Sequence, residues 1–425
     1  MKSIIRLYKN AFTGLSEPTW ILSAVMLINR TGAMVIPFLS IYLVKDLGFD
    51  EGEAKWVMTA YGLGAISGTF LGGILTDKFG SYHVQLWSLL VTGVYFIFLS
   101  ELHTFWSLTL GVFFLSVIAD VLRPANGASI GHYARKENLT KAFSLNRLAI
   151  NLGYSIGPLV GGMLIAYGYH ILFYVDGVTC VIAGLLFGWY FKSRRRSEEK
   201  EIEESKKISG KSMSILKDRP MLLFLVSNVL FGTVFFQLLF TLPLYYTLED
   251  GYGLSESTAG ALIGFNGVLI FILEMVIVDQ WGHKRSVGFF TVLGVLLAGI
   301  SFLMLNFYTS IAWLVISMAT LSMAEIFAIP FAVTLVSQNS PAQSRGKYMS
   351  YYSMSFAAAR VLAPLLGLAV VDVYGFETLW WYSGVVALLS GTGFFYSTSI
   401  IEQRSKNPIA RVKGLVRRSK ELRGA

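Results

Sequence analysis

Long apolar stretches alternate with short polar ones along the whole chain. Runs of about 20 apolar residues, enough for a helix to cross roughly 30 Å of hydrocarbon, recur twelve times. Backbone groups in a bilayer find no water, so runs of this length must be helices. The pattern therefore predicts an all-α polytopic membrane protein with twelve transmembrane helices, near residues 20–43, 55–75, 84–101, 105–127, 142–166, 171–191, 220–247, 257–278, 286–306, 309–332, 350–373 and 378–400.

The composition agrees with this prediction. Of the 425 residues, 54% are hydrophobic and 14% are charged, whereas soluble domains have about 25% charged residues. The single cysteine, Cys180, excludes an intrachain disulfide, and the five histidines are scattered without the spacing of metal ligands. No Walker-type phosphate-binding sequence is present. We therefore expect no metal, no cofactor and no enzymatic activity.

Basic residues are unevenly divided between the two sides of the predicted helices. With the N-terminus inside, only Lys45 and Lys55 lie outside, and the inner loops and the tail hold the other basic clusters. Lys and Arg are enriched on the cytoplasmic side of membrane proteins. We predict a cell (inner or plasma) membrane protein with both termini cytoplasmic. The net charge of +9 then reflects topology and contact with anionic lipids, not nucleic-acid binding.

A polar segment divides the twelve runs into two sets of six. Residues 192–219 carry mixed charge and few apolar side chains, which is typical of a solvated linker. The sequence thus predicts an N-terminal six-helix bundle over 1–191, a cytoplasmic linker over 192–219, a C-terminal six-helix bundle over 220–401 and a basic cytoplasmic tail over 402–425.

The two sets share sequence features at a nearly constant spacing. ILTDKFG at 74–80 matches VIVDQWG at 276–282, and GPLVG at 157–161 matches APLLG at 363–367. Two further matches lie between these in the same order. Two parallel six-helix bundles related by pseudo-two-fold symmetry are a transporter architecture, in which the substrate site lies near mid-membrane at the interface of the repeats.

The segment Gly73-Ile-Leu-Thr-Asp77-Lys78-Phe79-Gly80 is similar to a motif of the major facilitator superfamily, in which Gly and three residues precede Asp-Arg/Lys-x-Gly. A partial copy, from Asp279 through Gly282 to Lys284 and Arg285, follows the run at 257–278. The first copy departs from the motif, because Ser81 and Tyr82 stand where the family has basic residues. The chain resembles this family over essentially its full length, which implies the family's fold and transport by alternating access.

A second resemblance lies in the run at 142–166. Gly153, Gly157, Pro158, Gly161 and Gly162 follow the pattern GxxxGPxxGG, which the family uses mainly in proton-driven antiporters. Small residues at this spacing also pack helices closely, whatever else they do. The resemblance implies a monomer that exports a drug-like compound or metabolite in exchange for protons.

The carboxylate that ends the run at 55–75 has a physical use in such a transporter. Asp77 can cap the positive N-terminus of a helix in the opposite half, and we expect this to be the helix at 350–373. Such a contact is worth roughly 0.3–2 kcal/mol, which biases two states without freezing either. The alternative, in which Asp77 only ends a helix at the membrane surface, stays open. The predicted gating residues are Gly73, Asp77, Lys78, Gly80, Asp279 and Gly282.

Charged residues inside the predicted spans are costly, so each is a candidate for function. Burial raises a carboxyl pKa and a nearby arginine lowers it, so motion of an acid relative to an arginine can bind and release a proton. Glu325 and Arg360 fit this requirement best, since they lie at similar depth on consecutive helices. Asp120 and Arg123, three residues apart, can pair with each other, and Glu274 is a further candidate. A static salt bridge is the alternative for each.

The substrate itself is a small molecule whose identity the sequence does not indicate. Asn29, Arg30 and Pro37 lie on the first run, which lines the cavity in the family that the chain resembles, and Tyr245 and Tyr246 end the seventh run. We predict that these five residues contact substrate. An alternative within transport is a proton symporter that imports small peptides or similar solutes. A sensor or membrane enzyme on the same scaffold is the third hypothesis.

Overall fold

The structure is a computed structural model that describes residues 6, 9–49, 51–195, 215, 218–247, 252–254, 256–308, 310–341 and 344–406. Within this part of the chain every regular element is a helix, which confirms the predicted all-α fold. The α-helices are α2 (Glu17–Thr31), α3 (Val35–Ile41), α4 (Glu51–Phe79), α5 (Ser81–Leu99), α6 (Phe105–Asp120), α7 (Leu122–Tyr133), α8 (Leu139–Leu164), α9 (His170–Phe191), α11 (Arg219–Phe235), α12 (Gln237–Phe240), α13 (Leu242–Thr247), α14 (Glu256–Trp281), α15 (Val287–Met304), α16 (Ile311–Asn339) and α17 (Arg345–Lys406).

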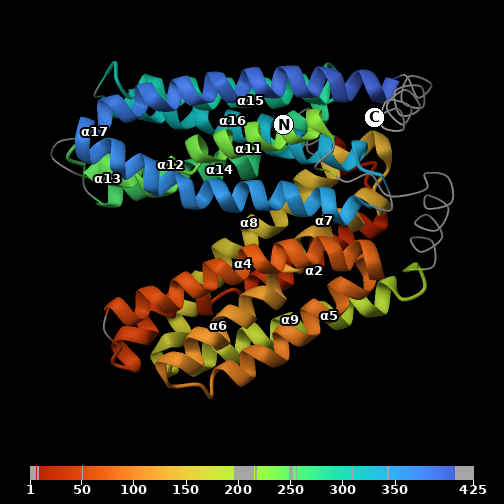
Figure 1. The fold of residues 1–425 in the computed structure, drawn as a ribbon, viewed down its shortest axis with the longest axis vertical. Helices are drawn as coiled ribbons and strands as arrows, with labels where there is room; N and C mark the ends of the chain where they lie inside the picture. Colours follow the sequence, from red (N-terminus) through yellow and green to blue (C-terminus); the bar gives the residue numbers. More distant parts are fainter. Residues whose placement is uncertain are drawn as a thin grey trace, which may run out of the picture. The chain divides into compact units, whose positions relative to one another are not determined.

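The number of membrane-spanning segments follows from the shape of α17. Eleven helical segments of the described chain are long and apolar enough to cross a membrane. The last of them, α17, holds two of the twelve predicted runs, because the chain turns back on itself at Gly375 (Figure 1). Gly375 has φ 78° and ψ 173°, a conformation that residues with a side chain rarely adopt. The described helices are therefore consistent with twelve spans.

Contacts within the chain divide it into two compact units. The first holds Met1–Ser212 together with Val336–Ala357, and the second holds Met213–Leu335 and Ala358–Ala425. The end of α16 and the start of α17 thus belong to the same unit as the N-terminal helices. In the predicted division into 1–191 and 220–401, these residues belong to the C-terminal bundle. The reason for the difference is a set of close contacts between α4 and α17, described below. Of the predicted linker and tail, residues 196–214 and 407–425 lie outside the described part of the chain.

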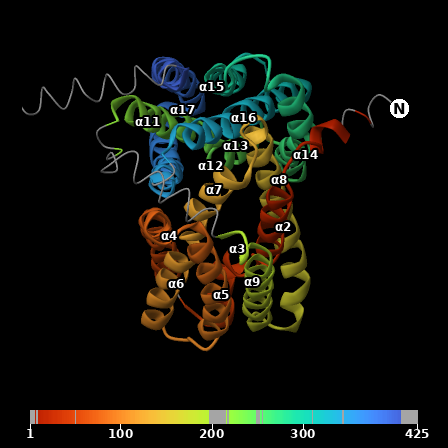
Figure 2. The same cartoon turned by 90° about the vertical axis from the view of Figure 1, so that its right-hand side faces the viewer.

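In the first unit, helices pack in pairs through small residues. The helix α4 packs along α6 and α5 along α9, and α2 lies against both α8 and α9 (Figures 1 and 2). A Cβ atom built on Gly68 would lie 2.3 Å from the carbonyl oxygen of Val117, so only glycine permits this approach of α4 to α6. Close backbone approach through small residues is the usual way that helices associate in a membrane.

The first predicted span is broken in the middle. The helix α2 ends at Thr31 and α3 begins at Val35. The backbone amides of Met34 and Val35 donate to the two carboxylate oxygens of Asp176 on α9, at 2.9 and 3.1 Å. Asp176 is only 1% exposed. This carboxylate therefore supplies the acceptors that the start of α3 lacks within its own helix.

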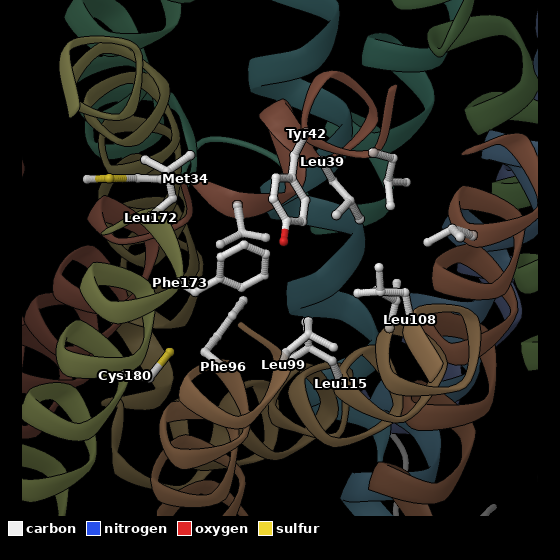
Figure 3. Close-up of a cluster of buried hydrophobic side chains, with 14 residues drawn as sticks. Met34, Leu39, Tyr42, Phe96, Leu99, Leu108, Leu115, Leu172, Phe173 and Cys180 are labelled. Atoms are coloured by element: carbon white, nitrogen blue, oxygen red, sulfur yellow. The ribbon is translucent and has the colours of Figure 1, made fainter. Parts of the chain in front are cut away.

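The residues around the break hold α3 and α2 against the same helix. One turn from Asp176, Cys180 accepts a hydrogen bond from the side-chain amide of Asn29, at 3.2 Å. Figure 3 shows the apolar side of this junction, where Met34 and Tyr42 lie near Leu172 and Phe173 of α9. The rings of Tyr42 and Phe173 are 5.4 Å apart. Asn29 and Arg30 lie in the last turn of α2, so the contacts at the break hold this turn against α9.

The second unit has an interruption at the corresponding place. Its first span consists of α11, α12 and α13, and Gln237 at the interruption is 206 residues from Thr31, which ends α2. The Gln237 side-chain amide donates to the carbonyl oxygens of Thr233 and Ala363, at 3.1 and 3.0 Å. The first span is therefore interrupted at corresponding positions in the two units, and in each unit a buried polar side chain stabilises the interruption.

Asp176→Ala should destabilise the protein, because it leaves the amide of Val35 without its acceptor, at about 1–3 kcal/mol. The amide of Met34 loses one of two acceptors and keeps the carbonyl oxygen of Gly32. Asp176→Asn keeps one acceptor oxygen and should cost less. Thermal unfolding of the purified protein in detergent measures the melting temperatures of the two variants and the wild type. The control is Cys180→Ala, which removes only a weak sulfur acceptor. Equal melting temperatures for the wild type and Asp176→Ala would show that Asp176 does not stabilise the break.

Candidate functional site

The end of α4 meets the start of α17 within the first unit. The backbone amide of Lys347 donates to the carboxylate of Asp77, and its nitrogen lies 3.3 Å from each of the two carboxylate oxygens. The Lys347 Nζ lies 4.0 Å from the same carboxylate, and the Asp77 side chain is 8% exposed. Because α17 begins at Arg345, Asp77 lies at the positive end of that helix. This is the contact with the helix at 350–373 that the sequence predicts; its role in gating stays a prediction.

Glycines and a serine allow the two helices to approach at this point. A Cβ built on Gly73 would lie 2.4 Å from Cβ of Ser350, and one on Gly346 would lie 2.8 Å from Oδ1 of Asp77. The hydroxyl of Ser350 donates to the carbonyl oxygen of Thr69, at 2.6 Å. Larger residues at Gly73 or Gly346 would therefore separate Asp77 from the start of α17.

The rest of the first motif shapes the turn after α4. Gly80 has φ 82°, which lets the chain pass from α4 into α5 without a gap. Ser81 forms a hydrogen bond with Ser129 of α7, and Tyr82 stacks on Phe187. These two residues, which replace basic residues of the family motif, therefore pack in the first unit instead of carrying charge.

Aromatic rings lie at the ends of α4 and α14, next to Lys78 and to the second copy of the motif. The Lys78 ammonium lies 5.1 Å from the ring of Phe79. In the second unit α14 ends at Trp281, next to Asp279 and Gly282, and the Trp281 ring stacks on Phe327. A gating role for Lys78, Asp279 and Gly282 stays a prediction.

The glycine-rich motif of α8 forms the surface on which the broken first span packs. A Cβ on Gly153 would lie 2.6 Å from Cβ of Arg30, and one on Gly157 would lie 3.0 Å from the carbonyl oxygen of Ala33. Gly161 faces Met34, and Gly162 has more room, with its nearest neighbour, Phe38, at 3.7 Å. The side chain of Pro158 lies outside the description. The motif thus brings α8 against the segment that carries Arg30.

Two arginines in the spans stack on aromatic rings. Arg30 of α2 lies over the ring of Tyr154 of α8, with 5.3 Å from the guanidinium carbon to the ring centroid. In the second unit Arg360 of α17 lies over the ring of Phe236, at 5.1 Å. Such contacts stabilise a cation by about 0.5–2 kcal/mol, more when water is excluded.

A cluster of polar residues lies where α6 passes into α7. Asp120 and Arg123 form an ion pair across the junction between the two helices. The Asp120 side chain is 6% exposed and that of Arg123 is 38% exposed. Tyr61 of α4 lies within electrostatic range of this pair and of Arg30 and Tyr154. Four helices of the first unit besides α8, namely α2, α4, α6 and α7, therefore contribute to one polar face.

The second unit buries two acids within its spans. Glu325 on α16 is 7% exposed, and Glu274 on α14 is fully buried. Each of the two side chains interacts with other residues of the chain. Arg360, the arginine paired with Glu325 in the sequence prediction, is exposed on α17 in the same unit. Coupling of any of these groups to protons stays a prediction.

The five predicted substrate residues lie in different surroundings. Arg30 is half-buried and Pro37 is exposed on α3. Asn29 is 8% exposed and bonded to Cys180, so it packs against α9. Tyr246 is fully buried, and the Tyr245 ring packs on Trp380 and Phe376. Contact of these five residues with substrate stays a prediction.

Asp176, Tyr61 and Tyr154 are not among the residues that the sequence predicts for the site. Asp176 is an acid inside the run at 171–191, and that position alone was sufficient signal. Tyr61 and Tyr154 gave no signal, since the chain has 21 tyrosines and their partners come from other helices.

Comparisons with known proteins agree with this architecture. The family model of the Major Facilitator Superfamily matches residues 19–352 and 290–423. A Na(+), Li(+), K(+)/H(+) antiporter from Planococcus maritimus is 25% identical over 407 residues, with 89% of this chain and 95% of the antiporter covered. Multidrug resistance protein MdtH from Yersinia enterocolitica is 22% identical, with 85% and 90% covered.

The solved structures show the same fold. The proton:xylose symporter XylE superposes with a TM-score of 0.69 at 16% identity, with 89% of this chain and 94% of XylE covered. At that identity the likeness shows the fold alone. Together with the family model, which covers most of the chain, it shows that this protein belongs to the Major Facilitator Superfamily and is an integral membrane transporter, not an enzyme.

Proposed function

We propose that this transporter exports a small organic solute in exchange for protons. The observation that carries the proposal is the burial of carboxylic acids inside apolar spans, above all Glu325 and Glu274 of the second unit. An ionised carboxylate in such surroundings costs several kcal/mol unless it is paired or hydrated. Proton binding removes that cost, so these acids can hold a proton in one conformation and release it in another.

Glu325 is the proposed proton carrier, and Arg360 is the group that controls its proton affinity. The two residues lie in the same unit, on α16 and α17. An arginine that approaches an acid favours the ionised form, and one that moves away favours the protonated form. Asp120 is a weaker candidate because it already forms an ion pair with Arg123, and Glu274 could take part in the same transfer.

The direction of coupling is inferred from the relatives. The Planococcus relative is an antiporter by name and the Yersinia relative a multidrug resistance protein by name, and these names support antiport of a drug-like compound for this chain. Proton-coupled import of small peptides or similar solutes is the alternative. A second class of cargo, Na⁺, Li⁺ or K⁺, is favoured by the name of the Planococcus relative alone.

The energy available is sufficient for export. One charge that crosses a potential of 100 mV releases about 2.3 kcal/mol. At 1.4 kcal/mol per tenfold change in concentration, one proton supports a gradient of roughly fifty-fold.

Gating is assigned to the contact of Asp77 with α17. We place the protein in the cell membrane as a monomer with both termini in the cytoplasm, so this contact lies on the cytoplasmic side. It closes that side in one state and must open for substrate to enter. The dipole of α17 makes the contact favourable, and its modest strength lets it break in each cycle.

Glu325→Gln should abolish proton-coupled transport, because glutamine has nearly the shape of glutamate but cannot carry the proton. Liposomes that contain the purified protein and a pH-sensitive dye would measure proton flux on addition of organic compounds from a drug and metabolite panel, and of Na⁺, Li⁺ and K⁺. Proton movement opposite to the compound indicates antiport, and movement in the same direction indicates the symport alternative.

The control for this measurement is Glu101→Gln, which changes an exposed acid after α5. It should transport like the wild type. Intact coupling in Glu325→Gln across the tested pH range would exclude Glu325 as the proton carrier.

Asp77→Asn should open the contact with α17 more often, since it removes the charge at the start of that helix. A loss of about 0.3–2 kcal/mol corresponds to about a 2- to 30-fold faster reaction of a buried probe, Ser350→Cys, with a water-soluble maleimide. The background is Cys180→Ala, and Glu137→Gln, an exposed acid in the same unit, is the control. An unchanged maleimide rate in Asp77→Asn would contradict the gating role.

A further inference from the structure

The two cation–π pairs occupy the same position of the internal repeat. Arg30 and Phe236 are 206 residues apart, and so are Tyr154 and Arg360. In the first unit the arginine comes from the broken first span and the ring from α8. In the second unit the ring comes from the broken first span and the arginine from α17. Each unit therefore contains the same pair of cation and ring, with the two roles exchanged between the helices.

The exchange matters because the two arginines have different surroundings. The unit of Arg360 also buries Glu325 and Glu274, whereas Asp120, the acid of the polar face, is already paired with Arg123. In the described part of the chain no carboxylate lies within ion-pair distance of Arg30. Its Nε is buried and has no hydrogen-bond partner.

Of the two arginines near Tyr61, Arg30 is the one without an ion pair to a described carboxylate. Tyr61 has two arginines, Arg30 and Arg123, and one acid, Asp120, within electrostatic range. Asp176, the other acid nearby, uses both oxygens for the amides of Met34 and Val35. This face is accessible, since Tyr154 is 42% exposed and the Arg123 side chain is 38% exposed. A cation in contact with lipid would be costly, so an accessible face with these residues is one that faces water.

We propose that Arg30, oriented by Tyr154, binds the negatively charged group of the substrate, and that the substrate is an organic carboxylate. The proposal deepens the proposed function and rests on it. A guanidinium presents its N–H groups in a planar fork that matches the two oxygens of a carboxylate. The Tyr154 ring covers one face of the guanidinium and leaves its edge for the ligand. The ligand would accept hydrogen bonds from the N–H groups at that edge.

The test is ligand binding by the purified full-length protein in detergent. The probes are a panel of aromatic and aliphatic carboxylates, each with its carboxamide and with an amine of the same size, and binding is measured by thermal shift and calorimetry. The wild type should bind carboxylates of the panel and not their carboxamides. Arg30→Gln should weaken carboxylate binding about 10- to 150-fold, the range expected for charge-assisted hydrogen bonds.

Two further variants separate recognition from folding. Tyr154→Leu removes the ring and should weaken carboxylate binding about 2- to 30-fold, whereas Tyr154→Phe keeps the ring and should bind like the wild type. Arg30→Lys keeps the charge without the fork and should fall between the wild type and Arg30→Gln. The melting temperature without ligand checks that each variant is folded, and Tyr154→Leu serves if Arg30→Gln is not.

Several results would overturn the assignment. They are binding of amines or carboxamides as tight as that of carboxylates, no binding by any carboxylate, or equal affinity in the wild type and Arg30→Gln. Failure of the proposed function is seen separately, in the liposome measurement on Glu325→Gln. Proton-coupled transport of amines alone would leave that function intact and refute carboxylate recognition by Arg30.

Discussion

A charged group inside an apolar span must be matched, because hydrocarbon and packed side chains offer it no water. The described part of the chain meets this constraint in four ways. Asp120 is matched by an arginine, Asp176 by two backbone amides, Arg30 and Arg360 by aromatic rings, and Asp77 by the start of a helix. Each match joins two helices, so the charges determine which helices lie together as much as the apolar surface does.

The same constraint explains why the protein can move. A match to a ring or to a helix end is worth a kcal/mol or two, whereas a buried ion pair is costly to break. The contacts that we assign to gating and to substrate are of the weaker kind, and the ion pair of Asp120 with Arg123 holds a junction within one unit. Alternating access requires weak contacts between segments that move and strong contacts between segments that stay together.

The sequence predicted the fold well, because span length and small-residue spacing are local properties. The twelve apolar runs and the packing of α8 follow from residues that are neighbours in the chain. Less of the candidate site could be predicted. Nothing in the run at 220–247 shows that Trp380 and Phe376 lie against Tyr245, and contact of Tyr245 and Tyr246 with substrate stays a prediction. The partners of Asp176 could not be predicted, since they are backbone amides 141 and 142 residues away.

The most direct measurement of the central claim is proton release on substrate binding by the purified protein in weakly buffered detergent solution. If an acid in the spans exchanges its proton for substrate, addition of the tightest-binding compound of the panel should release about one proton per transporter in the pH range where the acid is protonated. Glu325→Gln should release none. Binding of the same compound without any proton release between pH 5 and pH 9 would contradict the account.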